Sequence, residues 1–193
     1  MEDTPTREAV VPRLKGRFGH DYTYVDSSPS TQRLLPLDAP EGAVAVADEQ
    51  TEGRGRLGRR WEAPAGTSVL CSLQLRPPAD AARFPELTVV GAEACAEAIR
   101  TVTGLEPTLK HPNDVLIGGR KVAGILGESA EGRVVLGIGI NANIPAGELP
   151  AEVRIPATSL LIETGEPIDR VDLVVELLAA LERHYDAWLA TPK

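Results

Sequence analysis

The sequence is poor in aromatic residues and in cysteine. Aromatic residues make up 4% of the 193 residues, so Leu, Val, Ile and Ala must fill the core. The two cysteines, Cys71 and Cys95, lack the paired spacing of a zinc site. We expect both to be free, buried thiols in a reducing compartment, although the sequence alone does not forbid a disulfide. A disulfide-stapled secreted scaffold is therefore disfavoured.

Long apolar runs and a signal sequence are also missing. No run of about 18 apolar residues occurs, and the first four residues lack a basic stretch followed by an apolar one. The formal net charge of -8 and the pI near 5.0 argue against broad binding to nucleic acid or to anionic membranes. We therefore expect a cytoplasmic protein that binds neither DNA nor a membrane.

The common nucleotide-binding motifs are absent as well. The chain contains neither the Gly-x-x-x-x-Gly-Lys-Ser/Thr loop nor a Gly-x-Gly-x-x-Gly turn after a strand. His20, His111 and His184 show no spacing suited to a Ser-His-Asp relay. A nucleotide site in this protein must be built in another way.

Apolar periodicity predicts one α/β (α+β) domain with a mixed, largely antiparallel sheet flanked by helices. We expect an irregular lead-in over residues 1–20 and a single domain over residues 21–193. A helix starting near residue 30 would be capped by Ser28 or Ser30. Turns are expected at Gly118-Gly119 and Glu131-Gly132. The remaining predicted strands are residues 22–25, 43–47, 67–75, 108–110, 115–117, 121–128 and 134–140, and the predicted helices are residues 85–103 and 169–189.

Residues 53–61 form the most distinctive segment, with four arginines and three glycines in nine residues. Glycine allows the backbone to turn tightly, and guanidinium groups bind phosphate or carboxylate oxygens through paired hydrogen bonds. The segment is therefore a candidate anion-binding loop, and Trp61 at its end could stack on a base.

Two lysine-containing segments offer further candidate residues. Lys110, Asn113 and Asp114 precede an apolar strand, and the intervening Pro112 restricts the backbone there. They fit either an ordinary turn or a set of aimed polar groups. Lys121 opens the next strand, as an edge residue or as a cation that stabilises charge in a transition state. Gly124 and Gly127 in that strand suggest a close approach by another chain or a ligand.

Gly137 and Gly139 alternate within the last predicted strand. They would lie on one face and leave a slot for a flat, uncharged ligand, or else allow a helix to pack closely. Gln50 could pair with an amide or urea group, or lie on the surface. Ser30 and Thr31 could contact a ligand or cap a helix.

Together these segments resemble the catalytic domain of bacterial biotin protein ligases, from about residue 24 to 189. The resemblance is carried by five motifs in order, which are Gly53-Arg54-Gly55-Arg56 through Trp61, Lys110-x-Pro-Asn-Asp114, Lys121-x-Ala-Gly-Ile-Leu126, Gly137-x-Gly-x-Asn141 and Thr158-Ser159-Leu160.

The resemblance implies a two-step reaction. Biotin and ATP, the latter with Mg²⁺, would give biotinyl-5′-AMP and pyrophosphate, and the biotinyl group would pass to a lysine of a biotin carboxyl carrier protein. The catalytic residues it implies are Arg54, Arg56, Lys110 and Lys121. Its biotin-binding residues are Ser30, Thr31, Gln50, Gly53, Arg54, Arg56, Lys121, Leu126, Gly137 and Gly139. Its nucleotide-binding residues are Arg56, Arg59, Trp61, Lys110, Asn113, Asp114, Lys121 and Asn141. No metal ligand is assigned, and a homodimer is compatible with the resemblance.

The sequence departs from the family pattern in three respects. His111 replaces the usual tryptophan after the first lysine, and we expect it to be a structural histidine rather than a general base. Gln32 follows Ser30 and Thr31 where asparagine is frequent. We also expect no N-terminal DNA-binding domain, which disfavours a repressor role, and no small C-terminal β-barrel domain. Two alternatives stay open, namely an adenylating ligase for another acid or acceptor and a non-catalytic biotin- or adenylate-binding protein.

Overall fold

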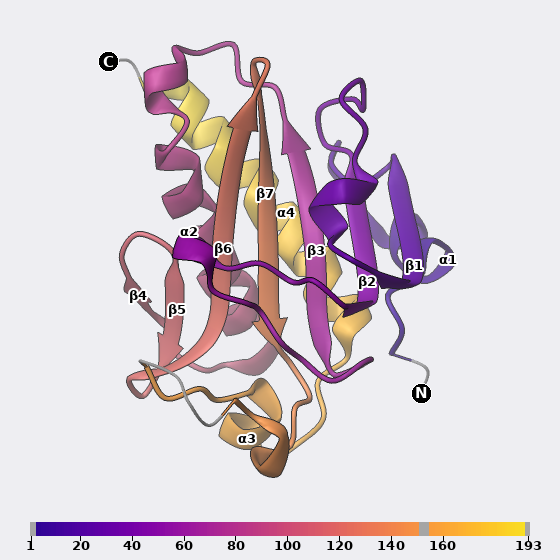
Figure 1. Ribbon diagram of the computed structural model, residues 1–193, viewed down its shortest axis with the longest axis vertical. Helices are drawn as coiled ribbons and strands as arrows, with labels where there is room; N and C mark the ends of the chain where they lie inside the picture. Colours follow the sequence, from indigo (N-terminus) through magenta and orange to yellow (C-terminus); the bar gives the residue numbers. More distant parts are fainter. Residues whose placement is uncertain (1–2, 151–154, 192–193) are drawn as a thin grey trace.

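A seven-stranded sheet forms the centre of the molecule. The computed structural model describes residues 3–150 and 155–191 (Figure 1). The strands are β1 (Tyr22–Ser28), β2 (Val44–Gln50), β3 (Ser68–Leu75), β4 (Thr108–Lys110), β5 (Asp114–Ile117), β6 (Arg120–Ala130) and β7 (Arg133–Asn141). Their order is β1-β2-β3-β7-β6-β5-β4, with β1 and β2 parallel and the other neighbours antiparallel. The predicted fold class is confirmed.

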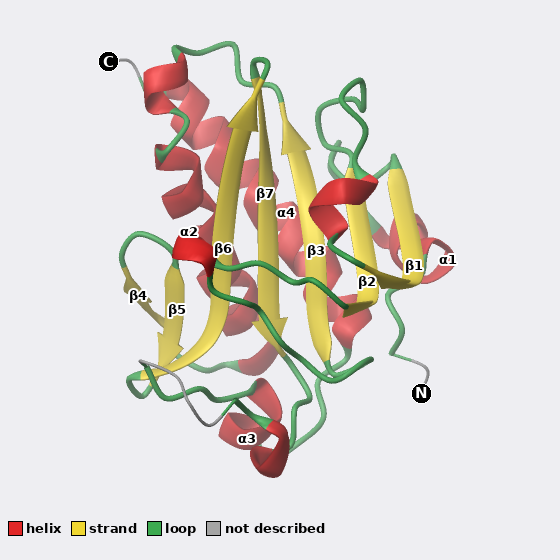
Figure 2. Cartoon of the chain, viewed as in Figure 1, coloured by secondary structure: helices red, strands yellow, loops and turns green. Residues whose placement is uncertain are grey.

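Two long helices, α2 (Glu86–Thr103) and α4 (Arg170–Ala190), lie together behind the sheet (Figure 2). The segment between β2 and β3 crosses in front of β3, β7 and β6, on the opposite face. The shorter helices are α1 (Arg7–Val10) and α3 (Leu160–Thr164). The 3₁₀ turns are η1 (Val11–Arg13), η2 (Thr31–Leu34), η3 (Arg56–Gly58), η4 (Ala81–Arg83) and η5 (Ala146–Glu148).

Both long helices follow from their sequences. The predicted stripe of α4 is buried from Val174 through Trp188, and Asp169 caps the helix by accepting hydrogen bonds from the first-turn backbone. Gly104 ends α2 in the left-handed conformation, with φ of 72°. The turns at residues 118–119 and 131–132 have positive φ at all four positions, which confirms the predicted hairpins.

Two local predictions are wrong. The lead-in is not irregular throughout, because α1 and η1 occupy residues 7–13 and Val10 and Phe18 belong to the core. The apolar ring of Phe18 packs against Tyr185 of α4, with 5.9 Å between ring centroids. Ser30 precedes only the short turn η2 and makes no side-chain capping hydrogen bond.

The cysteines are both free and buried, as expected. Burial raises the pKa of the Cys71 thiol to about 12, so this group stays protonated at neutral pH. In the described part of the chain, no helix is long and apolar enough to cross a bilayer.

Candidate active site

A cavity of about 350 Å³ lies between the sheet and the arginine-rich segment. Of the residues that the sequence proposes for the site, all but Gly53 and Lys110 line it. The cavity walls are Ser30, Thr31, Gln32, Gln50, Arg54, Gly55, Arg56, Arg59, Arg60, Trp61, Glu62, Cys71, Asn113, Asp114, Lys121, Gly124, Ile125, Leu126, Gly137, Ile138, Gly139, Asn141, Pro150, Ile155 and Ala157. Five of these side chains are cationic and two are carboxylates, although the whole chain carries a net charge of -8. The cavity can therefore attract an anion.

Residues 53–61, which we call the arginine hairpin, are closed by backbone hydrogen bonds. The amide of Trp61 donates to the carbonyl of Gly53 over 2.9 Å, and the amide of Gly55 donates to that of Arg59 over 2.7 Å. A Cβ atom at residue 53 would lie 2.3 Å from the Trp61 carbonyl oxygen, so only glycine fits there. Gly53 thus shapes the hairpin and does not line the main cavity.

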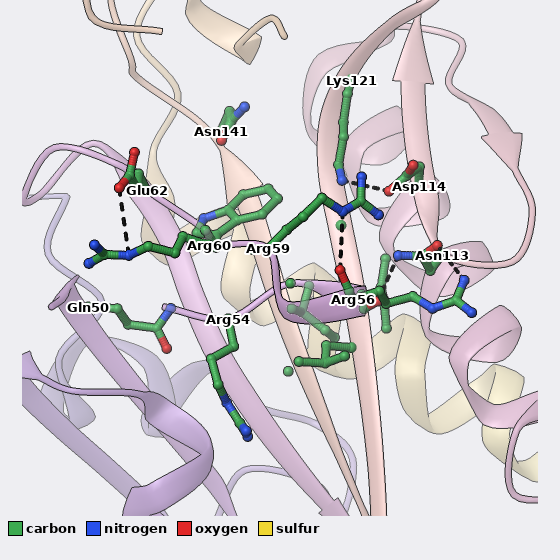
Figure 3. Close-up of a pocket in the computed structure, with 18 of the residues that line it drawn as sticks. Gln50, Arg54, Arg56, Arg59, Arg60, Glu62, Asn113, Asp114, Lys121 and Asn141 are labelled. Carbon is green, nitrogen blue, oxygen red and sulfur yellow. Dashed lines mark hydrogen bonds and ion pairs between the residues drawn. The ribbon is translucent and has the colours of Figure 1, made fainter. Parts of the chain in front are cut away.

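One end of the cavity holds a charged cluster, formed where β5 and β6 begin. Lys121 Nζ lies 2.6 Å from Asp114 Oδ1, and Arg56 Nη1 donates to Asn113 Oδ1 over 3.1 Å (Figure 3). The Asn113 amide also donates to the carbonyl of Ile125, so this side chain is fixed. The backbone of Lys121 pairs with residues 156 and 158, which close this end. Lys121 is thereby held beside a buried carboxylate, and Arg56 is held by the neighbouring amide of Asn113.

The other end presents uncharged hydrogen-bonding side chains, next to the ion pair of Arg54 and Glu128. The Gln50 side-chain oxygen accepts hydrogen bonds from the Thr31 amide and hydroxyl, over 2.8 and 3.2 Å. The Thr31 hydroxyl lies 2.7 Å from that of Ser72. Lys121 and Leu126, both in the cavity wall, are five residues apart on β6, so their backbones are about 17 Å apart at a strand rise of about 3.3 Å per residue.

The predicted glycine slot exists, but side chains of the protein lie in it. A Cβ atom on Gly139 would be 2.5 Å from the indole ring of Trp61, and one on Gly124 would be 3.0 Å from it. These two glycines sit side by side on β6 and β7. A Cβ atom on Gly137 would meet Gln32 at 3.1 Å. Gly124, Gly137 and Gly139 therefore make room for side chains in the cavity, and they do not allow a helix to pack closely. Among the described residues, the indole Nε1 of Trp61 has no hydrogen-bond partner.

The two arginines predicted to act together lie apart. Arg56 reaches the charged cluster, whereas Arg54 points away from Lys121 and pairs with Glu128 over 2.5 Å (Figure 3). Gly127, next to Glu128, faces the helix layer, since a Cβ atom there would lie 2.7 Å from Thr88 of α2. The two functions suggested for the β6 glycines, ligand contact and chain contact, are thus divided between Gly124 and Gly127.

Lys110 and His111 are outside the cavity. Lys110 is exposed on the edge strand β4, and His111 is exposed at the following turn. His111 is therefore not placed to act as a general base in the cavity. Thr158 and Ser159 have structural contacts, because the Ser159 hydroxyl donates to the carbonyl of Ile144 and caps α3. The Thr158 carbonyl accepts from the Asn141 amide over 2.9 Å, which fixes Asn141 at the cavity wall.

Sequence analysis missed several wall residues. Gln32 enters the sequence pattern only as a departure from it, although its place directly after Ser30 and Thr31 is a usable signal. Pro150, Ile155 and Ala157 follow η5 and lack any motif. Only the fold brings them to the cavity.

The sequence profile of the "Biotin/lipoate A/B protein ligase family" matches residues 22–144, more than half of the chain. This range contains the hairpin, β6 and β7 with their glycines, and the charged cluster. The chain belongs to the biotin/lipoate A/B protein ligase family. Its membership agrees with the resemblance carried by the five motifs.

Similar family members include the "Bifunctional ligase/repressor BirA" of Bacillus spizizenii, 40% identical over 177 residues that cover 87% of this chain and 54% of that protein. The "Biotin--[acetyl-CoA-carboxylase] ligase" of Paracoccus denitrificans is 38% identical over 174 residues, covering 86% of this chain and 72% of that protein. The chain thus spans about half the length of the Bacillus relative.

A solved structure of the family gives the same fold. The biotin protein ligase of Aquifex aeolicus "in complex with biotin and ATP" aligns with a TM-score of 0.78 and 32% identity, covering 88% of this chain and 72% of that one. This chain therefore shares its architecture with a biotin protein ligase.

Proposed function

We propose that this family member is an ATP-dependent biotin protein ligase. It would activate biotin as biotinyl-5′-AMP and transfer the biotinyl group to a lysine of a biotin carboxyl carrier protein in the cytoplasm. The observation that carries the proposal is the polarity of the cavity, which has an uncharged hydrogen-bonding end at Thr31 and Gln50 and a cationic end at Lys121 and Arg56. Biotin has the same polarity, with a ureido ring at one end and a carboxylate at the other.

The arrangement supports binding of both substrates in one cavity. The Gln50 and Thr31 end would take the ureido group, and the biotin carboxylate would then extend toward Lys121. The related Aquifex aeolicus ligase has been solved with biotin and ATP together, and that protein shares this fold. Trp61 would stack on adenine, which requires its ring to shift from the glycines that it covers.

The chemistry needs cations because both reactants are anions. A carboxylate oxygen of biotin attacks the α-phosphorus of ATP, an O–P bond forms, and pyrophosphate leaves. The lysine nitrogen of the carrier then attacks the acyl carbon, releasing AMP. Lys121 and Arg56 would reduce the repulsion between carboxylate and phosphate and stabilise the charge that develops during the first step. The arginine hairpin over the cavity would shield the mixed anhydride from water.

Mg²⁺ would enter with the phosphates of ATP. In the described parts of the chain, no group of three or more His, Cys, Asp or Glu side chains could hold a metal ion by itself. Mg²⁺ commonly uses one or two carboxylates together with substrate phosphates, and the buried carboxylate of Asp114 fits that use. When bound, the ion would neutralise phosphate charge, while Asp114 would still orient Lys121.

The test is incubation of the chain with biotin, ATP-Mg²⁺ and a biotin carboxyl carrier domain, with pyrophosphate and biotinylated carrier measured separately. We expect both products. Arg56→Ala should lower adenylate formation or release the adenylate into solution. If neither adenylate nor biotinylated carrier forms, the ligase proposal is wrong. Tight biotin binding in calorimetry without pyrophosphate release would favour a non-catalytic binder, and faster adenylation of another acid in a competition panel would favour a different acyl substrate.

A further inference from the structure

Gln32 closes the Thr31 and Gln50 end of the cavity through both the nitrogen and the oxygen of its side-chain amide. Its Nε2 donates to the carbonyl of Leu126 over 3.2 Å, and its Oε1 accepts from Arg54 Nη2 over 3.3 Å. The side chain comes from η2, whereas Leu126 lies in the middle of β6. The amide therefore spans the space between these two elements in a fixed orientation.

A glycine and an ion pair hold Gln32 in this place. Gly137 lets the side chain lie against β7, because a Cβ atom there would approach Nε2, Cδ and Cγ of Gln32 to 3.1, 3.2 and 3.4 Å. Arg54 is in turn held by Glu128, whose Oε2 lies 2.5 Å from Arg54 Nη2. Gln32, Arg54 and Glu128 thus form one chain of contacts, which we call the end wall.

A second cavity, of about 530 Å³, lies beyond this wall. It is lined by Arg33, Glu52 and Glu128 together with residues of the arginine hairpin. Gln32 lines only the main cavity, whereas six residues line both, namely Arg54, Gly55, Arg56, Arg59, Arg60 and Leu126. Through its hydrogen bonds with Arg54 and Leu126, the Gln32 amide lies at the part of this shared boundary that is next to Thr31.

We propose that Gln32 is a specificity-determining residue that limits the size of the acid at its ring end, with Glu128 as a positioning residue that acts through Arg54. This inference rests on the proposed function, since it takes the carboxylate to lie at the Lys121 end. The ligand class is a monocarboxylic acid with a compact bicyclic urea. Substituents on the ring system are rejected because they would collide with the amide or break its two hydrogen bonds.

Removing the wall should change selectivity far more than reactivity. Gln32 is at the end opposite Lys121 and Asp114, so its loss does not disturb the charged cluster. One methylene in a binding pocket changes discrimination by about 10- to 200-fold. Opening the wall toward the second cavity should therefore reduce the preference for biotin over ring-extended analogues by at least about tenfold.

The experiment compares wild type with Gln32→Ala, Gln32→Asn and Glu128→Gln. Arg33→Gln is the matched control, since Arg33 lines the second cavity and pairs there with Glu52 over 2.7 Å instead of with Gln32, Arg54 or Glu128. Dissociation constants from calorimetry and kcat/KM of pyrophosphate release are measured for biotin, for its sulfone, for an N-methyl ureido analogue and for an acid with one extra methylene in the side chain.

For each variant we compare kcat/KM for biotin with kcat/KM for each analogue. We expect this ratio to fall about tenfold or more for at least one ring-modified analogue in Gln32→Ala, and to fall less in Gln32→Asn and Glu128→Gln. The ratio for the chain-extended acid, which probes the other end, should stay unchanged, as should all ratios in Arg33→Gln. Unchanged ring selectivity in Gln32→Ala overturns the inference, and if that variant does not fold, unchanged selectivity in Gln32→Asn and Glu128→Gln does so.

The two proposals fail differently. Pyrophosphate release by wild type with unaltered selectivity in the variants would refute the role of Gln32 and leave the ligase proposal standing. Biotin binding that responds to the variants, without pyrophosphate release, would refute the ligase activity and support the end wall. If wild type binds none of the acids, both proposals are wrong.

Discussion

Lys121 and Asp114 form an ion pair at the charged end of the cavity, with 2.6 Å between Nζ and Oδ1. The side chains are 22% and 10% exposed, so water screens this pair only partly. The contact lacks the geometry of a directed hydrogen bond, and Lys121 Nζ also lies 5.5 Å from the centroid of the Trp61 ring. Lys121 is therefore held in place while its donors remain available to an incoming anion.

Replacing Lys121 should slow the first chemical step. We expect Lys121→Ala to reduce the rate of pyrophosphate release by about 10²- to 10³-fold, because one stabilising charge is removed from the transition state. Lys110→Ala is the matched comparison, since that lysine is exposed and does not line the cavity. Equal losses in the two variants would contradict the assignment of Lys121 as the acting cation.

A methyl group at residue 139 should displace Trp61. In Gly139→Ala the new atom would lie within 2.9 Å of three atoms of the indole ring, so the ring must move toward solvent. We expect a red shift of the tryptophan fluorescence. Trp188 is buried and is present in wild type and in Gly139→Ala, so the difference between their emission spectra reports Trp61. Gly147→Ala is the control, because nothing lies within 4 Å of its added atom; identical spectra for the two variants would refute the packing.

Removing Arg170 should destabilise the whole domain. This arginine is buried at the start of α4 and pairs with Asp48 at 2.7 Å and Asp3 at 2.9 Å. Arg170→Ala leaves these carboxylates without their counter-ion, which should lower the free energy of unfolding by about 3–5 kcal/mol. The exposed pair of Arg100 and Glu106 gives the comparison, since Arg100→Ala should cost only about 0–1 kcal/mol. Urea denaturation measures the free energy of unfolding of the two variants. Equal denaturation midpoints for Arg170→Ala and Arg100→Ala would contradict the prediction.

Glu97 should make stability dependent on acidic pH. A hydrogen bond from Arg183, supported by His184, holds the pKa of the Glu97 carboxyl below its usual value of 4.5. The unfolded state then binds the proton more readily, so the stabilisation is complete above pH 4.5 and is lost as the pH falls through the folded-state pKa. Glu97→Gln and Arg183→Ala should each flatten the loss of unfolding free energy between about pH 6 and about pH 3. An unchanged slope in both variants would show that Glu97 does not contribute.

The elements of the fold could be predicted because their signals are local. The buried stripe of α4 recurs every three to four residues, and the glycines at positions 118, 119 and 132 mark turns that need positive φ. The lead-in was mispredicted because its burial depends on a distant partner. Phe18 is a core residue that packs against Tyr185, which lies far along the chain.

The sequence by itself determined which residue types serve the site, namely the hairpin arginines, Lys121, the polar pair Thr31 and Gln50, and the glycines of the last strands. Tertiary structure decided how they are used. The register of β6 and β7 places Gly124 beside Gly139, and Trp61 covers both. Strand pairing leaves Lys110 on an exposed edge. Arg54 and Arg56 diverge because their partners lie in different places. Arg54 pairs with Glu128 on β6, whereas Arg56 donates to Asn113, the residue before β5. Spacing along a chain fixes what a segment can present, but partners distant in sequence meet only when the strands pair.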